Sequence, residues 1–227
     1  CQKASKILSV SAFTRQDIIE RYKINAEKIE VVYNGCSPIV PPATANKMQV
    51  PYFIFVGAVH PRKNILGLLK AFEFFKQRYA LPHQLLIIGR KAWMLDEVEL
   101  FYAQMQFRNE VIWKEHCERE IMLQWMQQAE AMVYPSWFEG FGIPIVEAMH
   151  LGVPIIASNV SAIPEVAGAA AVYIAPDNIE AIAEAMNKIV SDIKLRTQLI
   201  ENGKQRAQYF SWDSSAQKVA EIIRGYE

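Results

Sequence analysis

Two glutamates eight positions apart, Glu139 and Glu147, are the residues of this chain whose spacing best suits chemistry. Between them lie Gly140 and Gly142, which have no Cβ atom and therefore let a ligand come close to the backbone. Pro144 is well placed as the first residue of a helix, where a missing N–H costs nothing. The sequence therefore predicts a glycine-rich loop with one carboxylate, leading into a helix that carries the second carboxylate about one turn in.

The apolar run 131–134 before this loop has the length and composition of a buried strand. A strand, a tight loop and a helix N-terminus form an anion site, because the first N–H groups of the helix are free. Carboxylates on either side can accept hydrogen bonds from hydroxyl groups, so the pattern suits a nucleotide sugar. Taken alone, the spacing favours a simpler interpretation, in which Glu139 is solvated and Glu147 pairs with a lysine.

Composition narrows the classes of protein to consider. Apolar residues make up 52% of the 227 residues, which is enough for a substantial core. The 24 basic residues balance the 24 acidic ones, which argues against a nucleic-acid partner. Cys1, Cys36 and Cys117 are few and widely spaced, which indicates a reducing cytoplasm. We expect neither a membrane span nor a signal peptide.

Apolar runs and helical patterns alternate along the chain. This alternation predicts an α/β protein with a doubly wound parallel sheet. Thr14–Asp17 looks like a capping box that opens a helix, and 93–107 has the pattern of a core helix. The predicted strands are 7–11, 29–33, 52–57, 85–89, 111–114, 131–134, 153–157 and 171–174.

Two basic residues, Arg62 and Lys63, follow the strand 52–57, and Asn64 is a plausible N-cap for the next helix. They therefore belong at the carboxyl edge of the sheet, where open α/β sheets bind their ligands. A forked guanidinium and an ammonium both suit a diphosphate. Without further context, two exposed basic residues before a helix would be the simpler interpretation.

The whole string from Glu139 to Met149 resembles the C-terminal domain of retaining glycosyltransferases of family 4, which have the GT-B fold. Gly152-Val-Pro-Ile-Ile-Ala-Ser158 and Pro164-Glu-Val-Ala-Gly168 extend the resemblance. It implies a Rossmann-like C-terminal half of a GT-B enzyme and a chain that is part of a longer protein. The implied parts are the last unit of the N-terminal domain (1–36), a linker (37–51), a nucleotide-sugar-binding domain (52–210) and a C-terminal crossing helix (211–227).

The resemblance also implies residue roles. Glu139 would be catalytic by stabilising positive charge at the anomeric carbon, and Glu147 would bind the ribose. Family members often carry an arginine after the strand-end glycine, where this chain has Ala58, so we expect Arg62 to supply that charge. The implied contacts to the donor phosphates are Gly57, Arg62 and Lys63; those to the donor sugar are Glu139, Gly140, Phe141, Gly142 and Ile143; those to the base are His116 and Cys117.

The implied function is a retaining, metal-independent hexosyltransferase without a cofactor. The string Pro61-Arg-Lys-Asn64 is typical of a mannosyltransferase subgroup, so GDP-mannose is the favoured donor and a UDP-sugar stays open. The acceptor would be a glycan or a lipid-linked glycan, at the inner face of the membrane in the cytoplasm. Because the acceptor site belongs to the N-terminal domain, we expect this chain alone to be inactive.

Two alternatives stay open at this point. One is a noncatalytic domain that binds nucleotides or proteins. The other is a dinucleotide-dependent oxidoreductase, which is disfavoured because no strand is followed by Gly-x-Gly-x-x-Gly. His116 could in principle be catalytic, but a structural role or stacking on the base is favoured.

Overall fold

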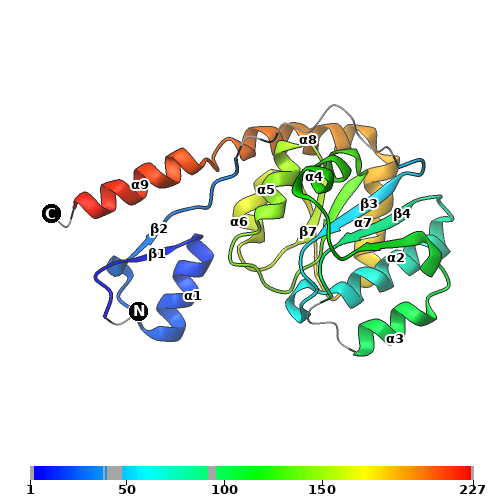
Figure 1. Ribbon diagram of the computed structural model, residues 1–227, viewed down its shortest axis with the longest axis horizontal. Coiled ribbons are helices and arrows are strands. Elements are labelled where there is room, and N and C mark those ends of the chain that lie inside the picture. The colour runs from blue at the N-terminus through cyan, green and yellow to red at the C-terminus, as the bar shows by residue number, and fades with distance from the viewer. Residues whose placement is uncertain (1–2, 38, 40–47, 92–95, 226–227) are drawn as a thin grey trace.

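The computed structural model describes residues 3–37, 39, 48–91 and 96–225. In these parts of the chain, the strands form a small parallel sheet of two strands and a larger sheet of six. Figure 1 shows the small sheet and its helix to one side of the larger domain, on the side where α6 lies. Most of the predicted linker, 37–51, lies outside the described residues.

The N-terminal unit consists of β1 (Ile7–Ser9), α1 (Ala12–Tyr22) and β2 (Ile29–Val31), with the two strands paired in parallel. The predicted capping box at Thr14–Asp17 is wrong. The helix begins one turn earlier, because the Ser11 side chain accepts a hydrogen bond from the Thr14 N–H and is the N-cap.

The six-stranded sheet is parallel throughout and has the order β5-β4-β3-β6-β7-β8. Counted along the chain from β3, this is the order 3-2-1-4-5-6 of the Rossmann fold, so the predicted doubly wound α/β fold is confirmed. Its topological switch point lies between β3 and β6. The strands are β3 (Tyr52–Val56), β4 (Gln84–Ile88), β5 (Val111–Lys114), β6 (Ala131–Tyr134), β7 (Ile155–Ser158) and β8 (Ala171–Ile174).

Helices cover both faces of this sheet (Figure 1). Helices α2, α3 and α7 pack on one another on one face, and α4, α5 and α8 pack together on the other. The bounds are α2 (Ile65–Tyr79), α3 (Asp96–Gln104), α4 (Arg119–Gln128), α5 (Ile143–His150), α6 (Ile163–Ala167), α7 (Ile179–Ser191), α8 (Ile193–Ala207) and α9 (Trp212–Arg224).

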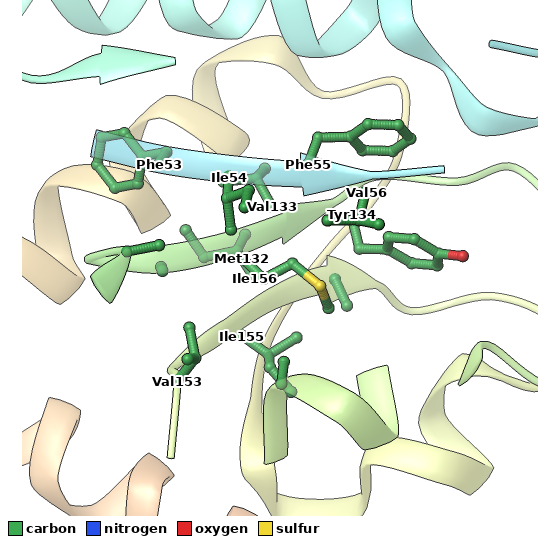
Figure 2. Packing of buried hydrophobic residues seen from close by; sticks show 14 of the residues in the cluster. Phe53, Ile54, Phe55, Val56, Met132, Val133, Tyr134, Val153, Ile155 and Ile156 are labelled. Carbon is green, nitrogen blue, oxygen red and sulfur yellow. The ribbon is translucent and has the colours of Figure 1, made fainter. Parts of the chain in front are cut away.

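The core lies on β3, β6 and β7, whose residues are all buried. Uninterrupted apolar runs are what a parallel sheet with two covered faces requires. Figure 2 shows these side chains in contact across the strands, with the Phe55 and Tyr134 rings at the carboxyl ends of β3 and β6. The two rings stack with centroids 5.9 Å apart, so the core reaches the edge where ligands are expected.

Some predicted helix ends differ from the structure. Helix α5 begins at Ile143, so Pro144 is its second residue rather than its first. The predicted helix 93–107 is shorter: α3 covers Asp96–Gln104, and the predicted start at 93–95 lies outside the described residues. The last helix, α9, has no buried residue in the described part of the chain.

Candidate functional site

Three charged side chains meet at the switch point of the six-stranded sheet. Nη1 of Arg62 and Nζ of Lys63 each lie 2.6 Å from a carboxylate oxygen of Glu139. The two cations follow β3 and the carboxylate follows β6, so both loops contribute to one cluster at the carboxyl edge. We call these three residues the charged cluster. The sequence prediction placed all three at this edge.

Local backbone geometry explains why the two cations point to Glu139. Residues Pro61–Lys63 form a 3-10 turn in which Nδ1 of His60 accepts a hydrogen bond from the Arg62 N–H. The Trp137 N–H donates to the Arg62 carbonyl at 2.8 Å, and Arg62 donates in turn to the Phe138 carbonyl at 3.0 Å. The loops after β3 and β6 therefore hold each other in place.

Lys63 is a buried cation. Its ammonium also donates to the Tyr134 hydroxyl, and a Cβ atom placed on Gly57 would lie 3.6 Å from Nζ. Burial lowers the pKa of Lys63, and the Arg62 guanidinium lowers it further, whereas Glu139 raises it. The Glu139 carboxylate thus stabilises a buried ammonium group. A buried ammonium group suits an anionic ligand.

Glu147 is the second buried carboxylate. Its side chain is only 4% exposed and lies 2.7 Å from Nη1 of Arg119, whose side chain is 55% exposed. Burial raises the pKa of the Tyr134 hydroxyl well above its usual value, and the charges of Glu139 and Glu147 raise it further. Both carboxylates therefore lie close enough to this phenol to affect its ionisation.

The β6–α5 loop, residues 135–142, is held from two sides. The Glu139 N–H donates to the Ser161 hydroxyl at 3.0 Å, and the Gly140 carbonyl accepts from the Ser11 and Thr14 hydroxyls. Gly142 has φ +101°, a conformation that favours glycine, and it is the N-cap of α5. The predicted glycine-rich loop into a helix is thus present.

The remaining predicted residues lie in the β6–α5 loop, at the start of α5 and in the loop before α4. Phe141 is buried against Phe210, and Ile143 is exposed at the start of α5. His116 is exposed and Cys117 half-buried in the loop before α4, whose first residue is Arg119. This loop therefore adjoins Glu147 through the Arg119 ion pair.

A cavity of about 490 Å³ opens beside the charged cluster. Of the predicted site residues, Arg62 lines it, together with the half-exposed ring of Trp137. Aromatic and apolar walls with a few polar groups are typical of a small-molecule site.

Several residues at the site were not predicted as site residues from the sequence. Tyr134 was predicted as a strand residue, and nothing in an apolar run shows that its hydroxyl would meet Lys63. Arg119 lies 28 positions before its partner Glu147, outside the motif. Ser161 has φ +57° and contacts Glu139 across 22 positions. Such contacts depend on which strand ends the fold brings together.

The fold and the site together define a class. The parallel six-stranded sheet with helices on both faces is the α/β fold of GT-B glycosyltransferase neighbours. Residues 39–206 match the family described as Glycosyl transferases group 1, and the chain belongs to that family.

Relatives and solved structures agree with this assignment. The chain is 30% identical over 221 residues to O-antigen chain mannosyltransferase B of Escherichia coli, a match that covers 93% of this chain and 58% of the relative. It is 27% identical over 220 residues to the MMP alpha-(1->4)-mannosyltransferase of Mycolicibacterium hassiacum, covering 95% and 53%. The structure of Anabaena Alr3699/HepE in complex with UDP and glucose has a TM-score of 0.85 at 20% identity, covering 97% of this chain and 63% of that one. The chain thus spans little more than half the length of these two curated relatives.

Two features are absent from the described residues. No group of three His, Cys, Asp or Glu side chains is arranged to hold a metal ion within residues 3–37, 39, 48–91 and 96–225. No helix in the described part of the chain is long and apolar enough to cross a membrane.

Proposed function

We propose that this chain is the donor-binding part of a retaining hexosyltransferase that uses a nucleoside diphosphate sugar. The observation that carries the proposal is the charged cluster, with Arg62 and Lys63 both 2.6 Å from Glu139 at the switch point. These cations would neutralise the diphosphate as it leaves, which is the charge stabilisation that a metal ion supplies in other enzymes. The proposed reaction is therefore metal-independent.

Each part of the donor would meet a distinct group. Glu147 would accept hydrogen bonds from the ribose hydroxyls, and Glu139 from hydroxyls of the sugar. Oε1 of Glu139 is buried and, among the described residues, accepts no hydrogen bond of good geometry, although Lys63 pairs with it by charge. A sugar hydroxyl would supply that bond. The N–H groups at 141–143 would hold the sugar and phosphate, and the loop with His116 and Cys117 would hold the base.

In the proposed reaction the bond between the anomeric carbon and the diphosphate breaks, and a bond to an acceptor oxygen forms on the same face. The acceptor hydroxyl proton passes to the leaving diphosphate, so no enzyme nucleophile is needed. Glu139 would stabilise the positive charge that develops at the anomeric carbon, and Arg62 and Lys63 the negative charge on the leaving group.

Mannose is the proposed sugar and GDP-mannose the proposed donor. Several relatives bear mannosyltransferase names, and two of them are named for the O-antigen chain, which favours a glycan or lipid-linked acceptor. A structural neighbour holds UDP and glucose, so a UDP-sugar is the alternative donor. We expect this chain alone to bind the nucleotide weakly and to transfer no sugar.

Calorimetry with GDP, UDP and ADP tests the proposal. We expect GDP to bind with the highest affinity and Lys63→Met to weaken binding at least about tenfold, because charge-assisted hydrogen bonds contribute about 1.5–3 kcal/mol. Glu147→Gln should weaken the binding of GDP more than the binding of 2′-deoxy-GDP. Lys70→Met, at an exposed position on α2, is the matched control. If none of the three nucleotides binds the folded wild-type chain, the proposal is wrong.

A further inference from the structure

The string Pro164–Gly168 has no part in the proposed donor contacts, yet one of its residues joins the two sheets of the molecule. Glu165 lies on α6, and its carboxylate accepts hydrogen bonds from the N–H groups of Ala12 and Phe13 at 2.7 and 2.9 Å. The contact spans more than 150 positions of the chain and ends on the N-terminal unit.

The chemistry of this contact is that of an anion on a helix end. Ala12 and Phe13 are the first two residues of α1, and their N–H groups have no partner within the helix. One carboxylate oxygen reaches each of them, and the partial positive charge of the helix end adds to both bonds. Burial raises the pKa of the Tyr33 hydroxyl, which follows β2, and the Glu165 carboxylate raises it further. Two parts of the N-terminal side thus lie close to one carboxylate.

The backbone of Glu165 is held by the six-stranded domain. Arg206 on α8 donates to the Glu165 carbonyl at 2.6 Å and to the Val166 carbonyl at 3.1 Å. The carboxylate is therefore mounted on a backbone segment that a second helix fixes, and it is positioned as a rigid point of attachment.

The segment before Glu165 also holds the β6–α5 loop. The Ser161 hydroxyl accepts from the Glu139 N–H, and the Ala162 N–H donates to the Glu139 carbonyl at 3.3 Å. From the opposite side, Ser11 and Thr14 donate to the Gly140 carbonyl at 2.7 and 3.1 Å. The loop that carries Glu139 is thus enclosed between α1 and the segment 161–165.

We propose that Glu165 is a positioning residue, which clamps the first turn of α1 to α6 and so fixes the β6–α5 loop between them. The clamp itself does not depend on the proposed function; only its expected effect on donor binding rests on that function. Without the carboxylate, α1 keeps its own cap at Ser11 but loses its attachment to α6. The hydroxyls of Ser11 and Thr14 then no longer hold Gly140 in place, and Glu139 loses its fixed position.

Amide hydrogen exchange on the whole chain tests the clamp without any ligand. We expect Glu165→Ala to speed exchange at Ala12 and Phe13 at least tenfold and to raise it at Gly140 and Gly142, while β3 and β4 keep their protection. Glu165→Gln retains one carbonyl acceptor, so it should recover part of the protection. Glu180→Ala, an exposed glutamate in the first turn of α7, is the matched control.

The second measurement is GDP affinity by calorimetry in the same variants. We expect Glu165→Ala to weaken GDP binding threefold to tenfold and Glu165→Gln to weaken it less. The stability of the six-stranded sheet to unfolding should stay unchanged. Unchanged exchange at Ala12 and Phe13 in Glu165→Ala would overturn the clamp. Amide exchange that is accelerated equally over the whole six-stranded sheet would also overturn it, because such a change indicates a merely structural role. Faster exchange at α1 with an unchanged loop and unchanged affinity would overturn the positioning role. If wild-type chain fails to bind GDP, the proposed function fails, and exchange at the loop still decides the clamp.

Discussion

At the scale of single residues, each site carboxylate is paired with an arginine. Glu139 meets Arg62, and Glu147 meets Arg119; both glutamates are buried, whereas both arginines are largely exposed. Each pair has a buried carboxylate, so a ligand that displaces either arginine must itself hydrogen-bond that carboxylate, because a buried charge left without a partner is costly. The hydroxyls of a sugar and a ribose donate hydrogen bonds, so they would meet this requirement in the proposed function.

Lys63 makes the donor affinity depend on pH. Burial lowers its pKa below the usual 10.5, despite the opposing effect of Glu139. The protonated form would bind the diphosphate, so we expect GDP affinity to be full below this lowered pKa and to fall as the pH rises through it. Lys63→Arg should bind GDP without this alkaline fall, since a guanidinium stays charged.

Calorimetry from pH 7 to pH 10 measures both proteins, and Lys70→Arg serves as the control at an exposed position. If GDP affinity falls equally with rising pH in the wild-type chain and in Lys63→Arg, the group that titrates is not Lys63.

At the scale of elements, the start of α2 connects the fold to the site. Asn64 has φ +55°, and its Oδ1 caps the helix by accepting from the Gly67 N–H. Its Nδ2 donates to the Pro135 and Pro176 carbonyls, so one buried amide ties α2 to the ends of β6 and β8. The sequence predicted the cap correctly. It could not predict the two donated bonds, because they depend on which strand ends become neighbours.

Replacing Asn64 should therefore cost more than a helix cap. We expect Asn64→Ala to lower the free energy of unfolding by about 2–4 kcal/mol, since it removes the cap and leaves two buried carbonyls without a donor. Asn64→Gly should recover about 1–2 kcal/mol of this, because glycine tolerates the positive φ. Urea unfolding measures both variants.

The control is Asn178→Ala, which removes the N-cap of α7 at an exposed position and should cost about 1 kcal/mol. A cost of Asn64→Ala no larger than that of Asn178→Ala would show that the two donated bonds contribute little.

At the scale of the whole molecule, the strands of the large sheet were predictable and the link to the N-terminal unit was not. Apolar runs such as Tyr52–Val56 have one physical interpretation, a strand covered on both faces. The sequence analysis placed the start of α1 at Thr14, whereas its N-cap is Ser11, because periodicity does not fix the first residue of a helix. The bond from Glu165 to α1 joins residues more than 150 positions apart, and no local pattern predicts such a contact.

Histidines whose pKa is lowered in the folded protein should make the molecule less stable in mild acid. His83 stacks on Phe53 at 5.3 Å, and burial lowers its pKa below 6.5; Glu130 opposes this, whereas Lys76 and Arg196 add to it. Burial lowers the pKa of His150 as well. Between the folded pKa and 6.5 the unfolded chain binds more protons, so the free energy of unfolding falls as the pH falls through this window and is unaffected above it.

Urea unfolding at pH 7.5 and pH 5.5 measures this loss of stability. We expect His83→Phe, which keeps the aromatic stack, to show a smaller difference between the two pH values than wild-type chain, whatever its absolute stability. His116→Gln, at an exposed position, should keep the full difference. Since His150 is present in both variants, part of the loss of stability between pH 7.5 and pH 5.5 should persist in His83→Phe. A difference that His83→Phe leaves unchanged would mean that His83 adds nothing to it, and the acid loss would then have to come from other groups.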